Sequence, residues 1–231
     1  MKVGVIIPTR GDSPRFLENC IKQMEGQTLL PEVIYTVDFD PTSAAKDITK
    51  RYRVGYDKLC GEGVDVIAFI EDDEAYSPDF LRAMALAWSD AGKPELFGTT
   101  YTHYYHLIKK SYFTMYHLDR SSMMNTFIKP NLTFNWCADE NPYTDIHLWN
   151  MAKKGDFTWA LHNPNPPLSL GIKHGVGLCG GEFHTTVLEE FSGPRATKDP
   201  NGDLLRQVCS PESFEFFNTY FSESPEKQHL L

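Results

Sequence analysis

The chain has 231 residues, and its 22 Lys or Arg against 31 Asp or Glu give a formal net charge of −9 at pH 7. This balance argues against a protein that grips phosphate backbones with a broad basic face. The hydrophobic fraction of 41% and the charged fraction of 23% exclude a disordered or collagen-like chain.

No stretch of the sequence approaches the ~18 apolar residues that a membrane span needs, and the apolar run after Met1 is too short for a signal peptide. The five cysteines are odd in number and include no C-x-x-C pair, which favours free thiols over disulfides or a zinc site. We therefore expect a soluble, cytoplasmic protein without a membrane span.

In the first hundred residues, strand patterns alternate with helix patterns. Residues 2–8 form an apolar, β-branched run, and apolar residues at helical spacing follow Ser13 and Pro14, which favour a helix start. A second strand is expected over 32–38 and a second helix over about 43–59.

The third strand, over 64–70, is the most clearly marked. Its apolar residues lie on both faces, which indicates a central strand covered by helices on each side. Ser77 and Pro78 then begin a helix with a buried apolar stripe. Strands joined by helices in this order predict an α/β fold with a mostly parallel, Rossmann-like central sheet flanked by helices.

After about residue 95 the pattern changes. A strand is expected over 95–102, an aromatic strand or hairpin over 101–118, and a short helix over 143–154. Segment 162–202 is rich in Pro and Gly, so we expect a long loop or a lid over a site there. A closing helix is expected over 204–221.

Consecutive carboxylates directly follow the most buried strand, at Glu71, Asp72, Asp73 and Glu74. In an open parallel sheet, ligands bind beyond the carboxyl ends of the strands. Two unit charges about 4 Å apart repel by ~4 kcal/mol at an effective dielectric of 20, and a divalent cation with oxygen ligands relieves that repulsion. The position predicts a metal-linked site, and the alternative is an acidic turn that solvates itself or caps the next helix.

The ordered combination of VGVIIPTRGD, EVIYTVDFDP and FIEDDEAYSPDFL resembles the nucleotide-sugar-binding half of the family 2 glycosyltransferases with the GT-A fold. The resemblance covers about residues 2–90 well. It implies that residues 1–100 bind a nucleotide sugar, whereas residues 101–231 bind the acceptor and carry a flexible C-terminal lid, in one continuous GT-A domain.

The resemblance also implies site residues. Asp73 would bind Mn²⁺ or Mg²⁺, and Glu71, which stands where the family usually has Asp, would assist it or contact the donor ribose. The other residues implied in donor binding are Pro8, Thr9, Arg10, Asp38, Arg53 and Asp72. The alternative for Arg10 is a surface position or a place beside a helix, for Asp38 a plain turn, and for Arg53 a solvent-facing position.

An inverting transfer needs a general base that takes the proton of the acceptor hydroxyl. Residues 144–155 resemble the family's base motif, so Asp145 is the candidate base. Thr144 replaces the family's usual Glu, and Asp139 or Glu140 could supply the carboxylate instead. The alternative for Asp145 is an acid that stabilises the start of a helix.

Many GT-A enzymes complete the metal shell with a His near the C-terminus. His174 is the preferred candidate and His184 the alternative. Imidazole is a suitable ligand for Mn²⁺, and the neighbouring glycines would let the backbone approach a diphosphate.

The resemblance implies a metal-dependent hexosyltransferase whose donor is a nucleotide-diphosphate sugar, foremost a UDP-sugar. The acceptor is open: a saccharide, or a modified DNA base that could stack on the aromatic residues of 101–120. A nucleotidyltransferase and a non-catalytic nucleotide-sugar-binding module are the other readings. The single Gly of Pro8-Thr9-Arg10-Gly11-Asp12 counts against the nucleotidyltransferase.

Overall fold

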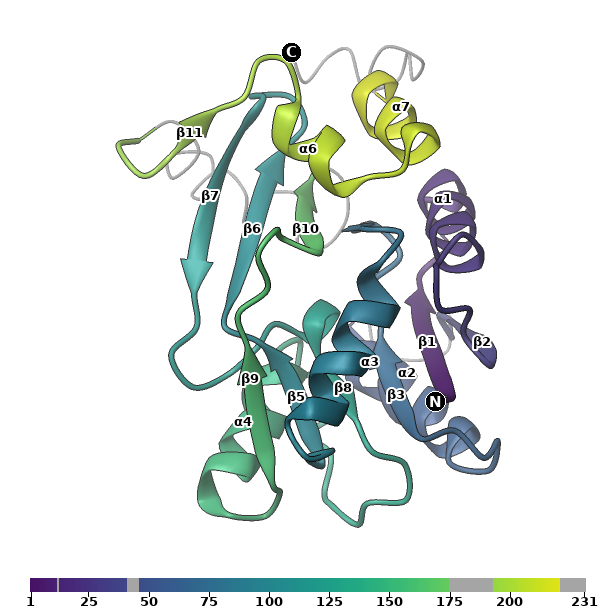
Figure 1. Ribbon diagram of the computed structural model, residues 1–231. Helices are drawn as coiled ribbons and strands as arrows, with labels where there is room; N and C mark the ends of the chain where they lie inside the picture. The colour runs from purple at the N-terminus through teal and green to yellow at the C-terminus, as the bar shows by residue number, and fades with distance from the viewer. Residues whose placement is uncertain (12, 41–45, 175–192, 221–231) are drawn as a thin grey trace.

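The computed structural model describes residues 1–11, 13–40, 46–174 and 193–220. Within them the chain forms a six-stranded sheet in the order β2-β1-β3-β8-β5-β9 and a five-stranded sheet in the order β11-β7-β6-β10-β4. The smaller sheet stands beside one end of the larger one, and helices cover both (Figure 1). Both sheets combine strands from residues 1–100 with strands from residues 101–231.

The larger sheet is mostly parallel. β1 pairs in parallel with both β2 and β3, and β5 pairs in parallel with β9. β8 is antiparallel to both of its neighbours, β3 and β5. The bounds of these strands are β1 Val3–Thr9, β2 Val33–Asp38, β3 Val66–Phe69, β5 Leu96–Thr99, β8 Phe127–Ile128 and β9 Trp159–His162.

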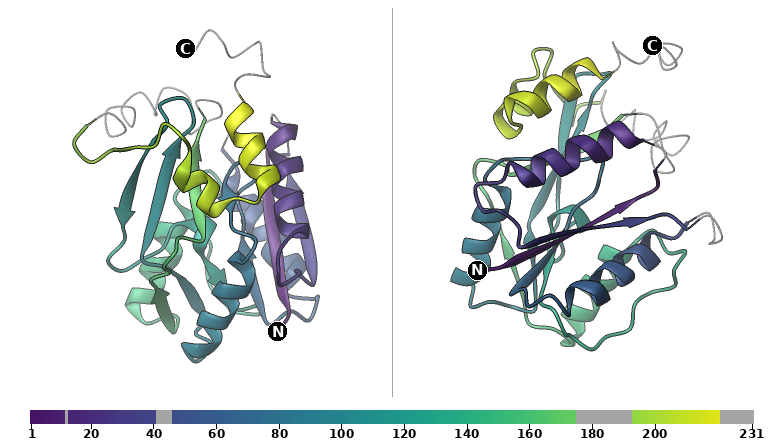
Figure 2. Two further views of the ribbon diagram at one scale, coloured as in Figure 1. Left: turned by 45° about the horizontal axis from the view of Figure 1, so that its top comes forward. Right: turned by 90° about the vertical axis from the view of Figure 1, so that its right-hand side faces the viewer.

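Helices cover both faces of this sheet, because β1 and β3 present apolar side chains to each side. Val5 of β1 lies in a core with α1 (Pro14–Glu25) and α3 (Phe80–Asp90). Ile6 lies in a second core with α2 (Ile48–Leu59) and α4 (Thr144–Lys154). Figure 2 shows α1 on one side of β1 and β2, with α2 and α4 on the other. This confirms the predicted α/β fold.

The smaller sheet contains the predicted hairpin, formed by β6 (Tyr101–His106) and β7 (Ser111–Tyr116). β4 (Ala75–Tyr76) and β11 (Thr197–Lys198) lie at its edges. The expectation of a continuous loop over 162–202 is wrong at β10 (Ser169–Lys173), which pairs with β6 and β4. The part of the predicted lid over 175–192 lies outside the described residues.

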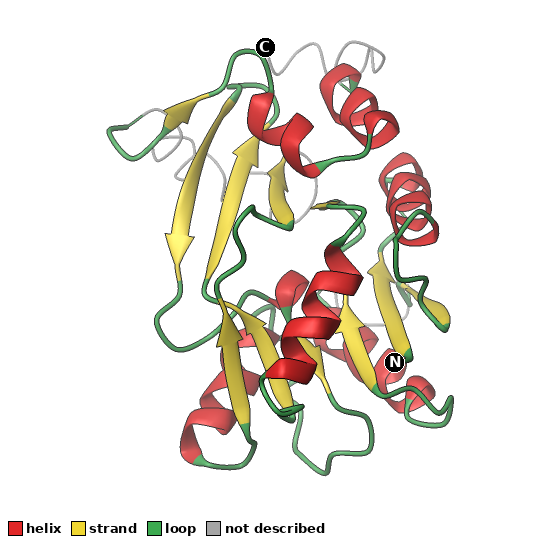
Figure 3. Cartoon of the chain, viewed as in Figure 1, coloured by secondary structure: helices red, strands yellow, loops and turns green. Residues whose placement is uncertain are grey.

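The predicted closing helix is divided into α6 (Asp203–Val208) and α7 (Pro211–Thr219). Pro211 cannot continue a preceding helix, so it stands in the first turn of a new one. Ser210 caps that turn by accepting a hydrogen bond from the amide of Ser213. Figure 3 shows these helices as separate segments beyond the smaller sheet.

Most other boundaries agree with the sequence patterns. The helix expected over 43–59 is α2, although residues 41–45 lie outside the described part of the chain. Ser13 precedes α1 but makes no capping hydrogen bond with its side chain. Gly155 ends α4 with φ of 93°, in the left-handed region that glycine adopts without strain. Among the described residues, no helix has the length and apolar character that a bilayer span requires.

Candidate functional site

The acidic turn lies just beyond the carboxyl end of β3. Carboxylate oxygens of Glu71, Asp73 and Glu74 all lie within 4.8 Å of one another. We call these three residues the acidic cluster. The structure therefore brings together Glu71, Asp73 and Glu74, and Asp72 is not a member of this group. The charges of Asp72, Asp73 and Glu74 all add to the burial that raises the pKa of the Cys20 thiol of α1.

Side chains of two helices hold this turn in place. Gln23 of α1 donates to the carbonyl of Glu74 at 3.1 Å and accepts from the amide of Tyr76 at 2.7 Å. The Glu71 amide donates to the Tyr76 hydroxyl at 2.9 Å. From α2, the hydroxyl of Tyr52 donates to a carboxylate oxygen of Glu71 at 3.1 Å. The acidic cluster is thus fixed by polar contacts as well as by its strand.

The end of β10 runs back along the acidic turn. In the antiparallel pair of β4 and β10, Ala75 lies opposite Leu170, so the residues after Leu170 pass beside those before Ala75. The Ile172 amide donates to a Glu74 carboxylate oxygen. His174 Nε2 lies 3.0 Å from Asp73 Oδ2. The pairing of two distant segments therefore places His174 at the predicted metal site.

Lys173 brings a positive charge into the same place. Its Nζ lies 3.8 Å from Glu74 Oε1 and 5.0 Å from the centre of the Tyr104 ring, and its side chain is only 18% exposed. Burial alone would lower the pKa of Lys173, but Glu74 and the neighbouring carboxylates raise it above its ordinary value. The crowded carboxylates therefore have a cation of their own.

The three carboxyl groups of the acidic cluster differ in acidity. Burial, together with the charge of Asp73, raises the pKa of Glu71 to about 7. Burial also raises the pKa of Glu74 well above its ordinary value, against the opposing charge of Lys173. For Asp73, burial is outweighed by the hydrogen bond and charge of His174, so its pKa is lowered. Asp73 is the member most strongly held as a carboxylate.

The residues present fit a divalent cation. Carboxylate oxygens of Glu71, Asp73 and Glu74 lie close enough together to share one ion, and the imidazole of His174 contacts Asp73. Oxygen and imidazole ligands suit Mn²⁺. His174 is nearly buried, and its Nδ1 has no hydrogen-bond partner within the described part of the chain. Its ring packs on Phe16 of α1, with centroids 4.4 Å apart. The predicted alternative, His184, lies outside the described residues.

Asp145 lies in the first turn of α4, and its charge makes a minor contribution to the raised pKa of Glu71. Arg120 Nη1 donates to Asp145 Oδ2 at 2.7 Å. Burial raises the pKa of Asp145, and the charge of Arg120 opposes that rise. Asp145 is thus a largely buried carboxylate held by Arg120.

The alternatives for the base lie in the loop before α4. Asp139 forms an ion pair with Arg53 at 2.7 Å, and Glu140 is exposed. Arg53, which the resemblance assigned to the donor, is therefore engaged with Asp139. Thr144, at the position of the family's usual Glu, is buried and its hydroxyl contacts that of Thr49.

The predicted residues of the first two strands lie at the same edge of the sheet. Pro8 and Thr9 pair in register with Val37 and Asp38, so both strand ends meet there. Thr9 is buried and accepts a hydrogen bond from the Gly11 amide at 3.2 Å. The Arg10 guanidinium lies 4.6 Å over the ring of Phe39. Asp38 is exposed.

The sequence patterns did not indicate Tyr52, Arg120 and Lys173 as site residues. Each contacts a candidate site residue or a member of the acidic cluster that is distant in the sequence, and none belongs to a recognised motif. Lys173 had the clearest signal, because it directly precedes the predicted ligand His174 in a Gly-flanked segment. A strand prediction for 169–173 would have drawn attention to it.

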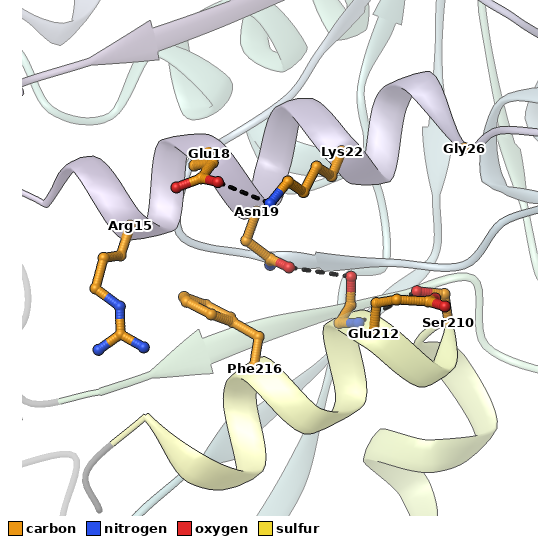
Figure 4. Close-up of a pocket in the computed structure, with 9 residues that line it drawn as sticks. Arg15, Glu18, Asn19, Lys22, Gly26, Ser210, Glu212 and Phe216 are labelled. Atoms are coloured by element: carbon orange, nitrogen blue, oxygen red, sulfur yellow. Dashed lines mark hydrogen bonds and ion pairs between the residues drawn. The ribbon is translucent and has the colours of Figure 1, made fainter. Parts of the chain in front are cut away.

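A separate hollow lies between α1 and α7 (Figure 4). It is lined by residues that include Arg15, Glu18 and Lys22 of α1 and Phe216 of α7. Ser213 Oγ donates to Asn19 Oδ1 across the two helices at 3.1 Å. None of the predicted site residues lines this hollow.

Comparisons with known proteins agree with this architecture. No protein-family model matches the chain, and a search of curated proteins finds no match. The crystal structure of S. aureus TarS 1–349 in complex with UDP-GlcNAc is similar, with a TM-score of 0.52 and 13% identity, over 99% of this chain and 78% of that one. The complex of the same fragment with UDP has a TM-score of 0.48 and 14% identity, over 99% and 77%. The first likeness supports the GT-A-type mixed α/β fold.

Proposed function

We propose that this protein is a metal-dependent glycosyltransferase that moves a hexose from a nucleotide-diphosphate sugar to an acceptor hydroxyl with inversion. The observation that carries the proposal is the contact of His174 with Asp73 of the acidic cluster, at the carboxyl end of β3. From α4, the charge of Asp145 adds to the raised pKa of Glu71 in the same cluster. The complex of the similar TarS fragment with UDP-GlcNAc supports a UDP-sugar as the donor.

In this proposal Asp73, Glu71 and His174 hold Mn²⁺ or Mg²⁺. When bound, the cation neutralises the charge that develops on the departing nucleoside diphosphate. Pro8, Thr9, Arg10 and Asp38 border the nucleoside, and Asp72 assists in binding the donor. Arg53 is a weaker donor ligand, because its guanidinium already pairs with Asp139.

Asp145 takes the proton of the acceptor hydroxyl as that oxygen attacks the sugar from the face opposite the leaving group. Arg120 orients the Asp145 carboxylate through its 2.7 Å contact. Arg120 contacts Oδ2 of Asp145. We therefore assign the proton transfer to the other carboxylate oxygen, Oδ1.

We propose a saccharide as the acceptor. Tyr101 and Tyr116 form an aromatic pair at the open end of the β6–β7 hairpin, and Tyr116 is 73% exposed. Such rings suit the apolar face of a sugar. A modified DNA base is the alternative, but Lys110 donates to Asn218 and Arg120 pairs with Asp145, so two basic residues of this segment already have protein partners.

A donor-hydrolysis screen over the common nucleotide sugars, with and without Mn²⁺, tests the proposal. We expect metal-stimulated release of the nucleoside diphosphate from at least one donor. Asp145→Asn is expected to lower sugar transfer by about 10²–10⁴-fold, the usual contribution of a general base. Asp73→Asn is expected to abolish the stimulation by Mn²⁺.

Asp90→Asn is the matched control, since Asp90 is exposed at the end of α3. It removes the same charge and is expected to leave both rates unchanged. Absence of turnover and of nucleotide binding with every donor would refute the proposal. Offering saccharides and hydroxymethylated DNA in parallel identifies the acceptor class.

A further inference from the structure

We infer that Lys173 binds the diphosphate of the donor, and that its ammonium group, which lies beside the acidic cluster, competes there with a divalent cation. The inference rests on the proposed function, which assigns a nucleotide-diphosphate donor to this edge of the sheet. It adds a residue that the sequence patterns did not indicate.

The first support is the location of the charge. Lys173 is the last residue of β10 and directly precedes His174, whose imidazole contacts Asp73. The ammonium lies 3.8 Å from Glu74 Oε1, and its charge also acts on Asp73 and Glu71. A phosphate that shared a cation with this cluster would therefore lie within reach of Lys173.

The second support is that the ammonium is loosely held. An ammonium group carries three N–H donors, and a charge-assisted hydrogen bond to a carboxylate is normally about 2.7–2.9 Å long. The 3.8 Å separation from Glu74 is too long for one. The Glu74 carboxylate already accepts from the Ile172 amide. Lys173 thus reaches the cluster with donor capacity that Glu74 does not satisfy.

The third support is a platform that fixes the direction of the side chain. Gly171 lies opposite Tyr104 in the parallel pair of β10 and β6, and a Cβ at Gly171 would lie 2.5 Å from the Tyr104 ring. The missing side chain lets that ring lie against β10, where the Lys173 ammonium stands 5.0 Å above it. A cation over an aromatic face is stabilised while it remains able to contact a ligand.

If Lys173 neutralises the acidic cluster and also binds phosphate, removing its charge should change the affinities for Mn²⁺ and for UDP in opposite directions. Without the lysine charge, the carboxylates should attract Mn²⁺ more strongly, because one like charge is removed from the metal's surroundings. The same change should weaken the binding of UDP, which loses a cationic partner. A lysine with a merely structural role would lower both affinities or neither.

The experiment measures two affinities of the full chain by isothermal titration calorimetry: Mn²⁺ alone, and UDP alone in the presence of a chelator. For Lys173→Gln we expect Mn²⁺ to bind about tenfold or more tightly and UDP about tenfold or more weakly, as expected for one charge at close range. Lys173→Arg keeps the charge and is expected to retain most of the UDP affinity. Lys58→Gln, on the exposed side of α2, is the matched control and should change neither.

Each outcome decides the inference. If both affinities fall in Lys173→Gln, the residue is structural; a thermal melt and the variant Lys173→Met separate that case from simple misfolding. If UDP binds wild type and Lys173→Gln equally, Lys173 does not contact the diphosphate, and only this inference fails. If wild type binds no UDP with the chelator and none when Mn²⁺ is added instead, the proposed function fails with it.

Discussion

At the scale of single residues, the ion pair of Arg120 and Asp145 helps to set the pH range in which Asp145 is ionised. Burial raises the pKa of Asp145, and Arg120 at 2.7 Å opposes that rise. The proposed base needs an ionised Asp145, so we expect activity to be lost as the pH falls through its pKa. Replacing Arg120 by Met removes the opposing charge, so the acid limb of the pH–rate profile is expected to move to higher pH.

The measurement is the rate of sugar transfer against pH for wild type, Arg120→Met and Arg120→Lys. The Lys variant keeps a charge but not the planar guanidinium, so we expect an acid limb between the other two. Arg82→Met, which breaks an exposed ion pair with Asp79, is the control. A uniform loss of rate at every pH, with the limb in place, would show that Arg120 does not tune Asp145.

At the scale of secondary-structure elements, the close approach of α2 to β1 depends on Gly55. A Cβ at this position would lie 2.5 Å from Ile6 Cγ2. Alanine favours a helix by about 1 kcal/mol over glycine, but overpacking a core usually costs about 1–3 kcal/mol. We expect Gly55→Ala to lower the free energy of unfolding by about 1–2 kcal/mol, measured by urea denaturation.

Gly61→Ala is the matched control for this helix. Gly61 lies just after α2, and its nearest neighbour to an added Cβ is 3.7 Å away. The substitution is expected to leave stability nearly unchanged. If Gly55→Ala were equally neutral, α2 would have room to move away from β1. The packing of this helix on the sheet would then be less rigid than the short distance indicates.

Over the whole molecule, the sequence predicted what depends on local patterns. The strand ending before Glu71 and the helix beginning after Pro78 follow from apolar periodicity and turn residues, and both agree with the structure. β10 was missed because it is short and flanked by Pro and Gly. Its position depends on pairing with β4 and β6, which lie far away in the sequence.

The same distinction applies to the site. The acidic turn and the His174 segment carry recognisable patterns, so their residues could be named in advance. The contact of Arg120 with Asp145 and the placement of Lys173 beside Glu74 arise only when separate elements pack together. Sequence reasoning could therefore name candidate ligands but not the cations that balance them.

Stability of the whole fold at acidic pH depends in part on His117, a buried residue that directly follows β7. It is 5% exposed, and its ring lies 3.3 Å from the Thr102 hydroxyl. Burial and the charge of Arg120 lower the pKa of His117 to about 4, against 6.5 for an unperturbed histidine. The unfolded chain therefore takes up a proton at a pH where the folded protein does not. This contribution to stability is complete above about pH 6.5 and is lost as the pH falls toward 4.

The pKa of Glu71, raised to about 7 by burial, gives the opposite trend, so the wild-type profile alone cannot isolate His117. A comparison with His117→Gln does, because the contribution of Glu71 is common to both proteins. Between about pH 7.5 and about pH 4.5, wild type is expected to lose about 2–3 kcal/mol more than the variant, measured by urea denaturation at each pH. A difference in the free energy of unfolding that is the same at every pH reports only the loss of the His117 side chain. A difference that changes with pH reports the proton that His117 takes up in the unfolded chain. Parallel profiles would mean that His117 becomes protonated in the folded protein, with the buried contacts around Thr102 opening to water to allow it.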